Sequence, residues 1–403
     1  MTISRRNILK SASTLPLVSY ASSLAQVMPS SLPDKKSFEE MDVRYINSAS
    51  QHPISLASSK AAENYLAKRR LHPDAPKGLH DSTGPLSKFA KLINADEEEI
   101  AYVQSTTAGE QMVLRSLGFP HDGGHIVTDT LHFSGSIPTY KGLNRMGVDV
   151  TWVKDRDGVV HPEDIKKALR SDTKLIALSL VAMHNGFEQD LKAVCDIAHA
   201  NGTLVYADII QAAGAIPIDV KESGVDFAAC SSYKWLMGDF GTGFLYVRKE
   251  IFSQLKRINF GYFNANAFRN DVETDEDNVN FGYAQSASSY FAMGTRPFAT
   301  VAILEHSLDY ILNIGVHNIQ THAQKMTDHL KEELPTLGYK LITPKMSKSP
   351  IVSCDFADAS KVLGPRLNEA KVKISVYADS FRISPSVFND MDDIDRLLRA
   401  LKI

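Results

Sequence analysis

Asp208 and Lys234 are the residues whose types and placement are best suited to chemistry. The apolar run at 203–207 ends on Asp208, and a second apolar run at 225–230 leads through Ser231 to Lys234. Short runs of this kind are typical of buried strands, so both side chains are expected near strand ends. A carboxylate there could keep the ring nitrogen of pyridoxal phosphate protonated, and the lysine could carry the aldehyde of that cofactor as a Schiff base.

Other polar residues could bind the rest of such a cofactor. Thr106 and Thr107 stand at the predicted start of a helix, where hydroxyls and free backbone N–H groups suit a phosphate. Ser231 and Tyr233 offer further donors, and Gln211 could hydrogen-bond the ring oxygen. Each residue taken alone has an ordinary alternative, such as a helix N-cap for the threonines.

His132 and Arg382 extend the candidate site. His132 follows a predicted strand and could lie over the face of the ring, although a lone histidine is more often structural. Arg382 lies on a short predicted strand near the C-terminus, and its planar fork of donors fits an α-carboxylate better than a lysine would. A surface ion pair is the alternative for Arg382.

The glycines at 238, 241 and 243 do not make a dinucleotide-binding motif. Their spacing is G-x-x-G-x-G, and a strand-like run follows them where that motif requires a helix. We expect them to let the backbone turn tightly behind Lys234. The sequence therefore argues against a nucleotide-binding domain.

Alternating strands and helices must position these residues. Strands are predicted at 100–104, 125–129, 148–153 and 175–181, and helices from 105 onward, at 161–170 and at 186–200. This alternation indicates the α/β class, with a parallel or mostly parallel sheet covered by helices on both faces. Ligands bind beyond the carboxyl ends of such strands, where Asp208, Thr106 and His132 are expected.

The composition is that of a globular enzyme. The chain has 403 residues, of which 43% are hydrophobic and 23% charged, and this length suffices for two domains. The net charge of −3 gives no electrostatic case for nucleic acid or an anionic membrane. Three scattered cysteines do not predict a disulfide framework or a metal site, and no apolar run is long enough to span a membrane.

The first 30 residues have the layout of a twin-arginine export signal. Arg5 and Arg6 precede a weakly apolar segment, rich in serine and alanine, that ends near Ala25. A disordered basic terminus is the alternative. The signal predicts a periplasmic or exported protein, and this route suits an enzyme that acquires its cofactor in the cytoplasm because it carries folded proteins.

Taken together, these motifs resemble the class V aminotransferase family of pyridoxal phosphate enzymes, and within it the isopenicillin N epimerase-like and cysteine desulfurase-like branch. The most specific stretches are 206–214 and 231–246. The resemblance implies fold type I, with a large domain around a mostly parallel sheet and a smaller α+β C-terminal domain. The expected division is 1–30 for the signal and linker, 31–56 for an N-terminal segment, 57–295 for the large domain and 296–403 for the small domain.

The resemblance also implies a role for each candidate cofactor residue. Lys234 would be the Schiff-base lysine, Asp208 the partner of the pyridinium nitrogen and His132 the ring-stacking residue; these three form the expected catalytic set. The remaining cofactor contacts would be Gln211 at the ring oxygen and, at the phosphate, Thr106, Thr107, Ser231 and Tyr233.

Substrate and partner contacts follow from the same resemblance. Arg382 would bind the carboxylate of an amino-acid substrate, with Asn185 as a second substrate contact. Thr295, in a Gly-Thr pair, would reach the phosphate of a neighbouring subunit. This implies a homodimer with active sites at the subunit interface.

The match to desulfurases is incomplete. Residues 371–382 contain no cysteine, whereas desulfurases place their persulfide-forming cysteine on a loop in this neighbourhood. Met183 stands where many of them have asparagine, and Tyr233 stands where many relatives have histidine. Cys354 lies in a strand-like run and is expected in a core. Persulfide transfer is therefore disfavoured.

The expected function is that of a pyridoxal phosphate enzyme acting at Cα of an amino acid or derivative. We favour aminotransferase or epimerase chemistry. A β-eliminating carbon–sulfur lyase and a cofactor-binding protein without turnover are the alternatives. Transamination, epimerisation and β-elimination all proceed from the same carbanion at Cα, and the sequence does not choose among them.

Overall fold

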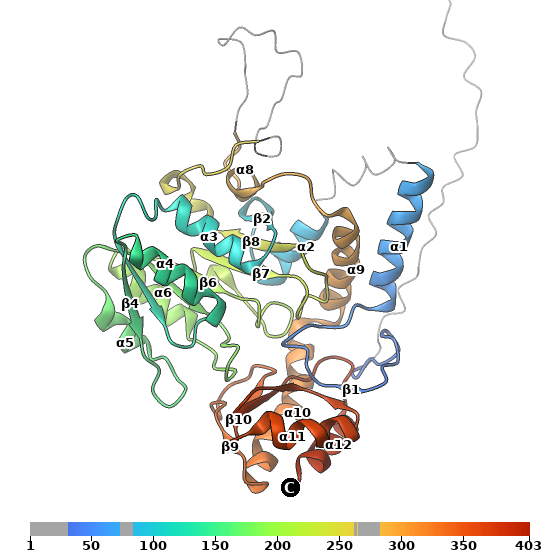
Figure 1. Cartoon of the computed structure of the whole chain (residues 1–403). Coiled ribbons are helices and arrows are strands. Elements are labelled where there is room, and N and C mark those ends of the chain that lie inside the picture. The colour runs from blue at the N-terminus through green and yellow to red at the C-terminus, as the bar shows by residue number, and fades with distance from the viewer. Residues whose placement is uncertain (1–30, 73–83, 262–263, 265–282) are drawn as a thin grey trace, which may run out of the picture.

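The computed structural model describes residues 31–72, 84–261, 264 and 283–403 (Figure 1). The predicted export signal and most of the polar stretch at 260–282 lie outside these residues. Within the described residues, no helix combines the length and apolarity that crossing a membrane requires.

A seven-stranded sheet forms the centre of the large unit. Its strands are β2 (Ile100–Val103), β3 (His125–Asp129), β4 (Asp149–Val153), β5 (Thr173–Ser179), β6 (Leu204–Asp208), β7 (Phe227–Ser231) and β8 (Gly243–Val247). The spatial order is β2-β8-β7-β6-β5-β3-β4, and β8 runs antiparallel to both of its neighbours while the other pairs are parallel. The prediction of an α/β fold with a mostly parallel sheet is confirmed.

Helices cover both faces of this sheet because its strands are apolar on both sides. One face packs against α2 (Gly84–Ile93), α5 (Pro162–Ala168), α6 (Leu191–Ala200), α7 (Val220–Ser223) and α9 (Phe298–Ile314). The other packs against α3 (Thr106–Ser116), α4 (Ile137–Arg145) and α8 (Ala287–Phe291). Phe244 and Leu245, which are consecutive in β8, point into the first and second of these cores respectively.

One predicted helix boundary is wrong. The sequence predicts a helix over 186–200, but α6 starts at Leu191. Gly186 has a positive φ of 72°, and a bridge between Val181 and Glu188 keeps this stretch extended. Asp190 then starts the helix as its N-cap, because its carboxylate accepts the amide of Ala193.

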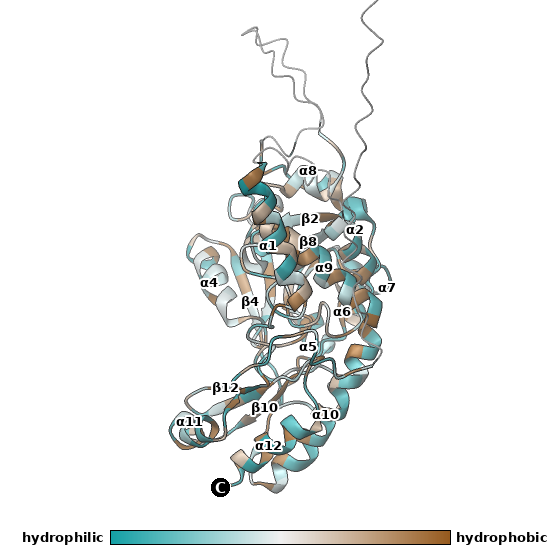
Figure 2. Ribbon diagram, turned by 90° about the vertical axis from the view of Figure 1, so that its right-hand side faces the viewer, coloured by the Kyte–Doolittle hydropathy of each residue, from teal (hydrophilic) through white to brown (hydrophobic). Residues whose placement is uncertain are grey.

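A smaller α+β unit follows the large one. Its antiparallel sheet has the order β12 (Ser375–Val376), β13 (Ser380–Ile383), β10 (Val352–Asp355) and β9 (Lys340–Leu341). Its helices are α10 (Val316–Thr336), α11 (Ala359–Glu369) and α12 (Met391–Leu401), and α10 runs down from the large unit along one side of the molecule (Figure 2). The boundary at 295 stays a prediction; α9 packs on the large unit through Val301 and Leu304.

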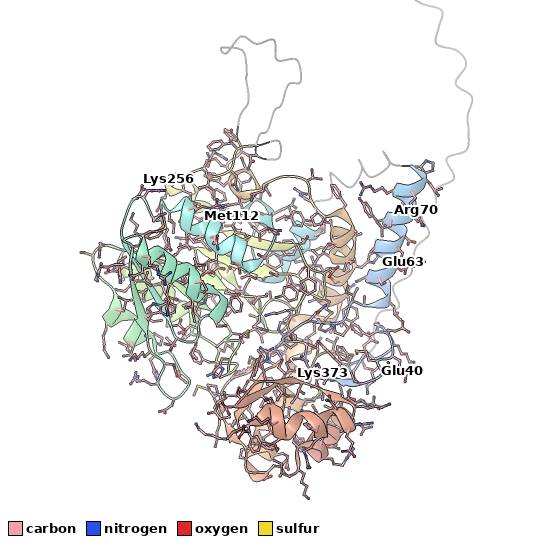
Figure 3. The ribbon with its side chains drawn as sticks, in the orientation of Figure 1. Glu40, Glu63, Arg70, Met112, Lys256 and Lys373 are labelled. Atoms are coloured by element: carbon pink, nitrogen blue, oxygen red, sulfur yellow. The ribbon has the colours of Figure 1, made fainter. Side chains whose placement is uncertain are left out.

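The helix α1 (Leu56–Leu71) packs along α9 at the edge of the large unit (Figure 1). Its outer side carries exposed charged residues, including Glu63 and Arg70, whereas Met112 of α3 is buried (Figure 3). The helix packs Ser58, Ala61 and Tyr65 inward, and its exposed side carries Leu66 and Leu71 beside the charged residues.

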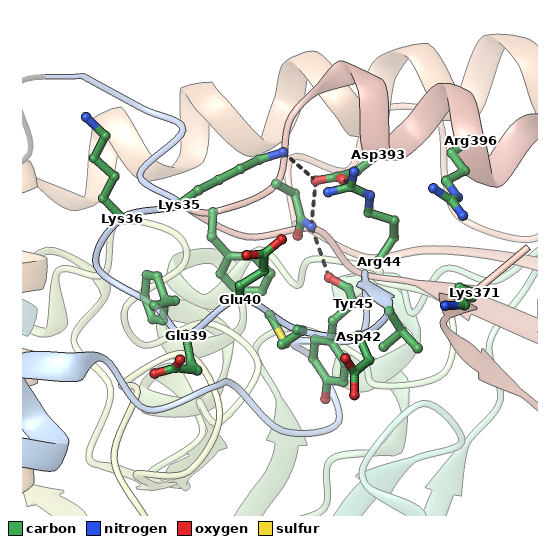
Figure 4. Close-up of a pocket in the computed structure, with 15 residues that line it drawn as sticks. Lys35, Lys36, Glu39, Glu40, Asp42, Arg44, Tyr45, Lys371, Asp393 and Arg396 are labelled. Atoms are coloured by element: carbon green, nitrogen blue, oxygen red, sulfur yellow. Dashed lines mark hydrogen bonds and ion pairs between the residues drawn. The ribbon is translucent and has the colours of Figure 1, made fainter.

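The N-terminal segment is attached to the small unit. β1 (Arg44–Tyr45) pairs in parallel with β11 (Val372–Lys373). A cavity of about 430 Å³ lies between residues 35–45 and α12, and Arg44 contacts Asp393 across it with a distance of 3.5 Å between Nε and Oδ1 (Figure 4). None of the predicted site residues lines this cavity.

Candidate active site

Asp208 lies at the carboxyl edge of the sheet, in register with Ser179 of β5 and Ala229 of β7. Its side chain is buried, and one oxygen accepts the amide of Ile210 at 2.9 Å. Burial raises the pKa of Asp208 to about 6, although the charges of His132 and Lys234 act in the opposite direction. This carboxylate would be stabilised by a bound cation or a strong donor.

Lys234 follows β7 and brings its amine to the same edge. The residue is 6% exposed, and among the described residues its amine has no hydrogen-bond partner. Burial lowers the pKa of Lys234 to about 8; the charge of Asp208 opposes this shift, and that of Arg382 adds to it. The structure therefore brings Asp208 and Arg382 within electrostatic range of Lys234.

Gln211 and Gly214 hold the loop that carries Lys234. The side chain of Gln211 accepts the indole N–H of Trp235 at 2.9 Å and donates to the carbonyl of Ala49 at 3.0 Å. Gly214 has a φ of 90°, and a Cβ there would lie 2.5 Å from the carbonyl oxygen of Trp235. Gln211 keeps one amide hydrogen for the predicted contact with a ring oxygen.

Thr106 and Ser231 join the start of α3 to the end of β7. The amide of Thr106 donates to Ser231 Oγ, and the amide of Ser231 donates to Thr106 Oγ1, both at 2.9 Å. Thr107 is the next residue of the first turn, whose N–H groups have no intrahelical acceptor. The predicted phosphate residues are thus adjacent, at a helix start that favours an anion.

Tyr233 packs against an aromatic neighbour beside the lysine. Its ring stacks on that of Phe240 with centroids 4.5 Å apart, and the Lys234 amine lies 5.8 Å from the Tyr233 ring centroid. The structure records no hydrogen bond between Tyr233 and the other predicted phosphate residues, so its phosphate contact stays a prediction.

His132 belongs to a buried network that the sequence reasoning missed. Its Nε2 lies 3.0 Å from Glu110 Oε1, and its Nδ1 lies 3.0 Å from Ser179 Oγ. Glu110 follows Thr106 by one helical turn, so it shares the face of α3 that carries a predicted site residue. That spacing was the one signal in the sequence that could have identified Glu110.

Arg382 lies on β13 at the side of the small unit that faces the large one. Its guanidinium donates to the carbonyl of Met183 at 3.1 Å and to Ser375 Oγ at 3.3 Å. Its Nε is buried and has no partner among the described residues. A buried cation with a spare donor is suited to bind a carboxylate.

Asn185 and Thr295 are the predicted residues that lie apart from this group. The amide of Asn185 is buried, donates to the carbonyl of Gly158 at 2.8 Å and accepts the amide of Phe187 at 3.0 Å. Asn185 keeps a second amide hydrogen, so its predicted substrate contact stays a prediction. Thr295 is exposed, next to the equally exposed Gly294.

The groups present fit pyridoxal phosphate. The buried amine of Lys234 has no hydrogen-bond partner among the described residues and would lose its unfavourable charge by bonding to the aldehyde. The raised pKa of Asp208 shows a carboxylate that a pyridinium N–H would stabilise. Together with the helix start at Thr106, the fold and this site define a pyridoxal phosphate-dependent enzyme of fold type I.

Comparisons with known proteins identify the family. The family model for class V aminotransferases matches residues 85–397. A probable cysteine desulfurase of Methanothermobacter thermautotrophicus is 31% identical over 296 residues, which cover 71% of each chain. An uncharacterized aminotransferase of Bacillus subtilis, YcbU, is 28% identical over 348 residues, covering 86% of this chain and 89% of the relative. The chain belongs to the class V aminotransferase family.

Solved structures agree with the fold. The cystine C-S lyase C-DES, in complex with its reaction product cysteine persulfide, has a TM-score of 0.79 at 18% identity and covers 90% of this chain and 97% of its own. Another structure of C-DES, with glycine covalently linked to the pyridoxal phosphate cofactor, has a TM-score of 0.82 at 19% identity, with coverage of 92% and 99%. At this level of identity the likeness supports the fold.

Proposed function

We propose that the chain is a pyridoxal phosphate-dependent carbon–sulfur lyase that cleaves the bond between Cβ and sulfur in cystine or another S-substituted cysteine. The probable cysteine desulfurase among the relatives supports this alternative better than the aminotransferase or epimerase chemistry favoured by the sequence alone. The observation that carries the proposal is the burial of all three cysteines of the chain.

A desulfurase takes sulfur onto one of its own thiolates, and these cysteines are unsuited to that step. Burial raises the pKa of Cys195 and of Cys354 to about 12, and it also raises the pKa of Cys230. Cys354 lies in the core of the small unit with Met326 and Leu330. Because a thiolate is the reactive form, the sulfur is expected to leave on a small molecule.

The site residues supply binding, orientation and proton transfer. The bound cofactor supplies an electron sink that acidifies the Cα proton of an amino acid. Arg382 is suited to hold the substrate carboxylate through its spare Nε donor. Lys234 is suited to accept the Cα proton because a pKa of about 8 leaves part of its amine neutral near pH 7. Asp208 would hold the proton on the ring nitrogen.

The reaction balances without an oxidant. The Cα proton and the sulfur with its substituent leave, and a double bond forms between Cα and Cβ. The 2-aminoacrylate that results is hydrolysed by water to pyruvate and ammonium. With cystine as substrate, the leaving group is cysteine persulfide.

A product assay tests this proposal. The full-length enzyme is incubated with cystine, S-methylcysteine, cysteine and alanine, and pyruvate, ammonium, released thiol or persulfide, keto acids and inverted amino acids are measured. We expect pyruvate and a sulfur product in equal amounts from cystine. A keto acid that keeps the substrate's side chain, or inversion at Cα, would favour the aminotransferase or epimerase alternative.

Cysteine substitutions separate a lyase from a persulfide-forming desulfurase. Cys195→Ala, Cys230→Ala and Cys354→Ala should each keep roughly half or more of the sulfur release, because buried thiols are inert. Circular dichroism controls for folding. Loss of sulfur release in one folded variant, with the other two active, would show that a thiol of the enzyme takes part.

We also propose that the enzyme is a homodimer in which Thr295 of one subunit approaches the phosphate site of the other. Two exposed apolar side chains support a subunit interface here. Met293 is 69% exposed, and Phe240, whose ring stacks on that of Tyr233 beside the lysine, is 56% exposed. A subunit interface over these side chains would remove their apolar surface from water. Sedimentation equilibrium should give twice the chain mass, and Thr295→Arg should weaken both the dimer and cofactor retention. A monomer with full cofactor binding would contradict the proposal.

A further inference from the structure

Glu110 is a buried carboxylate that none of the roles above uses. It lies in the second turn of α3 and is 2% exposed. A carboxylate removed from water to this extent is costly unless several donors surround it. Its partners therefore indicate what it does.

All of the donors to Glu110 come from the chain that follows β3. They are His132 Nε2 at 3.0 Å, Ser136 Oγ at 2.6 Å and the hydroxyl of Tyr140 on α4. Glu110 thereby ties α3, whose first turn carries Thr106, to the segment that carries His132. The network joins two parts of the predicted cofactor site.

The pKa shifts of Glu110 and His132 both agree with an ion pair between them. Burial alone would raise the pKa of Glu110, but the donors His132, Ser136 and Tyr140 outweigh it and lower this pKa. Burial alone would lower the pKa of His132, but the hydrogen bond and charge of Glu110 outweigh it and raise this pKa. Both directions describe a carboxylate paired with an imidazolium.

The second nitrogen of His132 fixes the ring on its other side. Nδ1 lies 3.0 Å from Ser179 Oγ, and Ser179 is in register with Asp208 across neighbouring strands. Both ring nitrogens are therefore bonded to the protein. Such a ring cannot carry a proton to and from a substrate unless one of these bonds breaks.

We propose that Glu110 is a positioning residue that holds His132 as a fixed imidazolium beside Asp208, so that His132 acts through its charge and keeps Asp208 ionised toward the cofactor ring. The inference rests on the pyridoxal phosphate site and does not depend on which bond of the substrate is cleaved.

The net effect of the Glu110–His132 pair is to lower the pKa of Asp208. His132 lowers the pKa of Asp208 more than Glu110 raises it. Neutralising Glu110 would remove its own charge and also lower the proton affinity of His132, so the net result is a less stable Asp208 carboxylate. The charged and titratable groups that interact with His132 or Asp208 from the packed elements are Glu110, Asp129, Lys234, Cys230 and the tyrosines Tyr140, Tyr206 and Tyr233.

Glu110→Gln tests the proposal because it keeps the shape and removes the charge. The full-length enzyme is loaded with pyridoxal phosphate and labelled with ¹³C in its histidine rings, and the His132 signal is followed against pH. The chain has 13 histidines, so a His132→Gln spectrum identifies the signal. We expect the titration midpoint of His132 to fall in Glu110→Gln, and the acidic limb of kcat to move to higher pH. Each unit of that movement costs about tenfold in rate below the limb, while KM changes little.

Asp226→Asn is the matched control. Asp226 is also a fully buried carboxylate paired with a histidine, His199, at 2.9 Å, but it precedes β7 at the opposite edge of the sheet. This variant should leave the His132 midpoint and the acidic limb unchanged.

Two outcomes would overturn the proposal. One is a His132 midpoint that does not move in Glu110→Gln, or that moves without any change in the acidic limb. The other needs no variant: a wild-type His132 midpoint at or below the ordinary value of about 6.5. If the histidine results hold and cystine yields no sulfur product, only the proposed carbon–sulfur cleavage fails.

Discussion

Lys234→Ala is expected to abolish activity while the protein stays folded. The variant loses the amine that we propose anchors the cofactor and accepts the Cα proton, and loss of a general base and covalent anchor costs about a thousandfold or more. The fold should survive because the amine has no hydrogen-bond partner among the described residues, and its lowered pKa shows that the ammonium is unfavourable where it lies. Turnover with cystine and the visible absorbance of the bound cofactor measure the loss.

Trapping identifies the anchored lysine directly. The wild-type enzyme is reduced with borohydride, digested and mapped, and the cofactor label should lie on Lys234. Lys221→Ala is the control variant, because Lys221 is an exposed lysine paired with Asp96 and should keep full activity. A label on any other lysine would show that the assignment of Lys234 is wrong.

Asp208→Asn is expected to lower activity and raise stability together. The amide cannot hold the proton on a ring nitrogen as a carboxylate can, and loss of one such electrostatic contact costs about a hundredfold or more in kcat. In the cofactor-free enzyme, the pKa of Asp208 is raised from 3.8 to about 6, so its ionisation destabilises the folded state. At 1.36 kcal/mol for each pKa unit, the variant should gain about 2 to 3 kcal/mol near neutral pH.

The difference in the free energy of unfolding between Asp208→Asn and the wild type should increase with pH. An acid whose folded-state pKa is raised causes no penalty below its unfolded value, and the full penalty above its folded value. The advantage of Asp208→Asn over the wild type should therefore be absent near pH 4 and complete above pH 6. Urea unfolding of both proteins across this range measures it, with the exposed Asp196→Asn as a control. A variant that is less stable than the wild type at pH 7 would contradict the account.

The sequence was sufficient to predict the fold class and the meeting of the main site residues. Apolar runs ending on Asp208, and leading through Ser231 to Lys234, indicated strands, and the carboxyl ends of parallel strands meet at one edge of a sheet. Thr106 was placed at the same edge by the helix that begins there. These inferences depend only on local pattern and on the topology that the pattern implies.

The buried polar network could not be predicted in the same way. Glu110 meets His132 only because α3 presents one particular face to the segment after β3, and Ser179 meets His132 because β5 pairs with β3. Gln211 bonds to Ala49, 162 residues away. Such pairings depend on tertiary packing, for which a single sequence carries no periodic signal.

The reaction type also could not be predicted from the pattern of residues. Lys234, Asp208 and Arg382 serve transamination, epimerisation and β-elimination alike, because all three begin with removal of the Cα proton. The fate of the sulfur depends on whether a thiolate can reach it. The sequence predicts burial for Cys354, and the folded chain shows that Cys195 and Cys230 are buried as well.

The attachment of the N-terminal segment to the small unit has a consequence for biosynthesis. Ala49 donates its amide to Ser384 Oγ across 335 residues of chain, and Ile46 lies in the core of the small unit. On the ribosome this segment is made long before its partners in the small unit. Its pairing can form only after almost the whole chain has been synthesised. The small unit therefore closes only when translation is nearly complete, and a product truncated before residue 372 would lack both Arg382 and the partners of its own first strand.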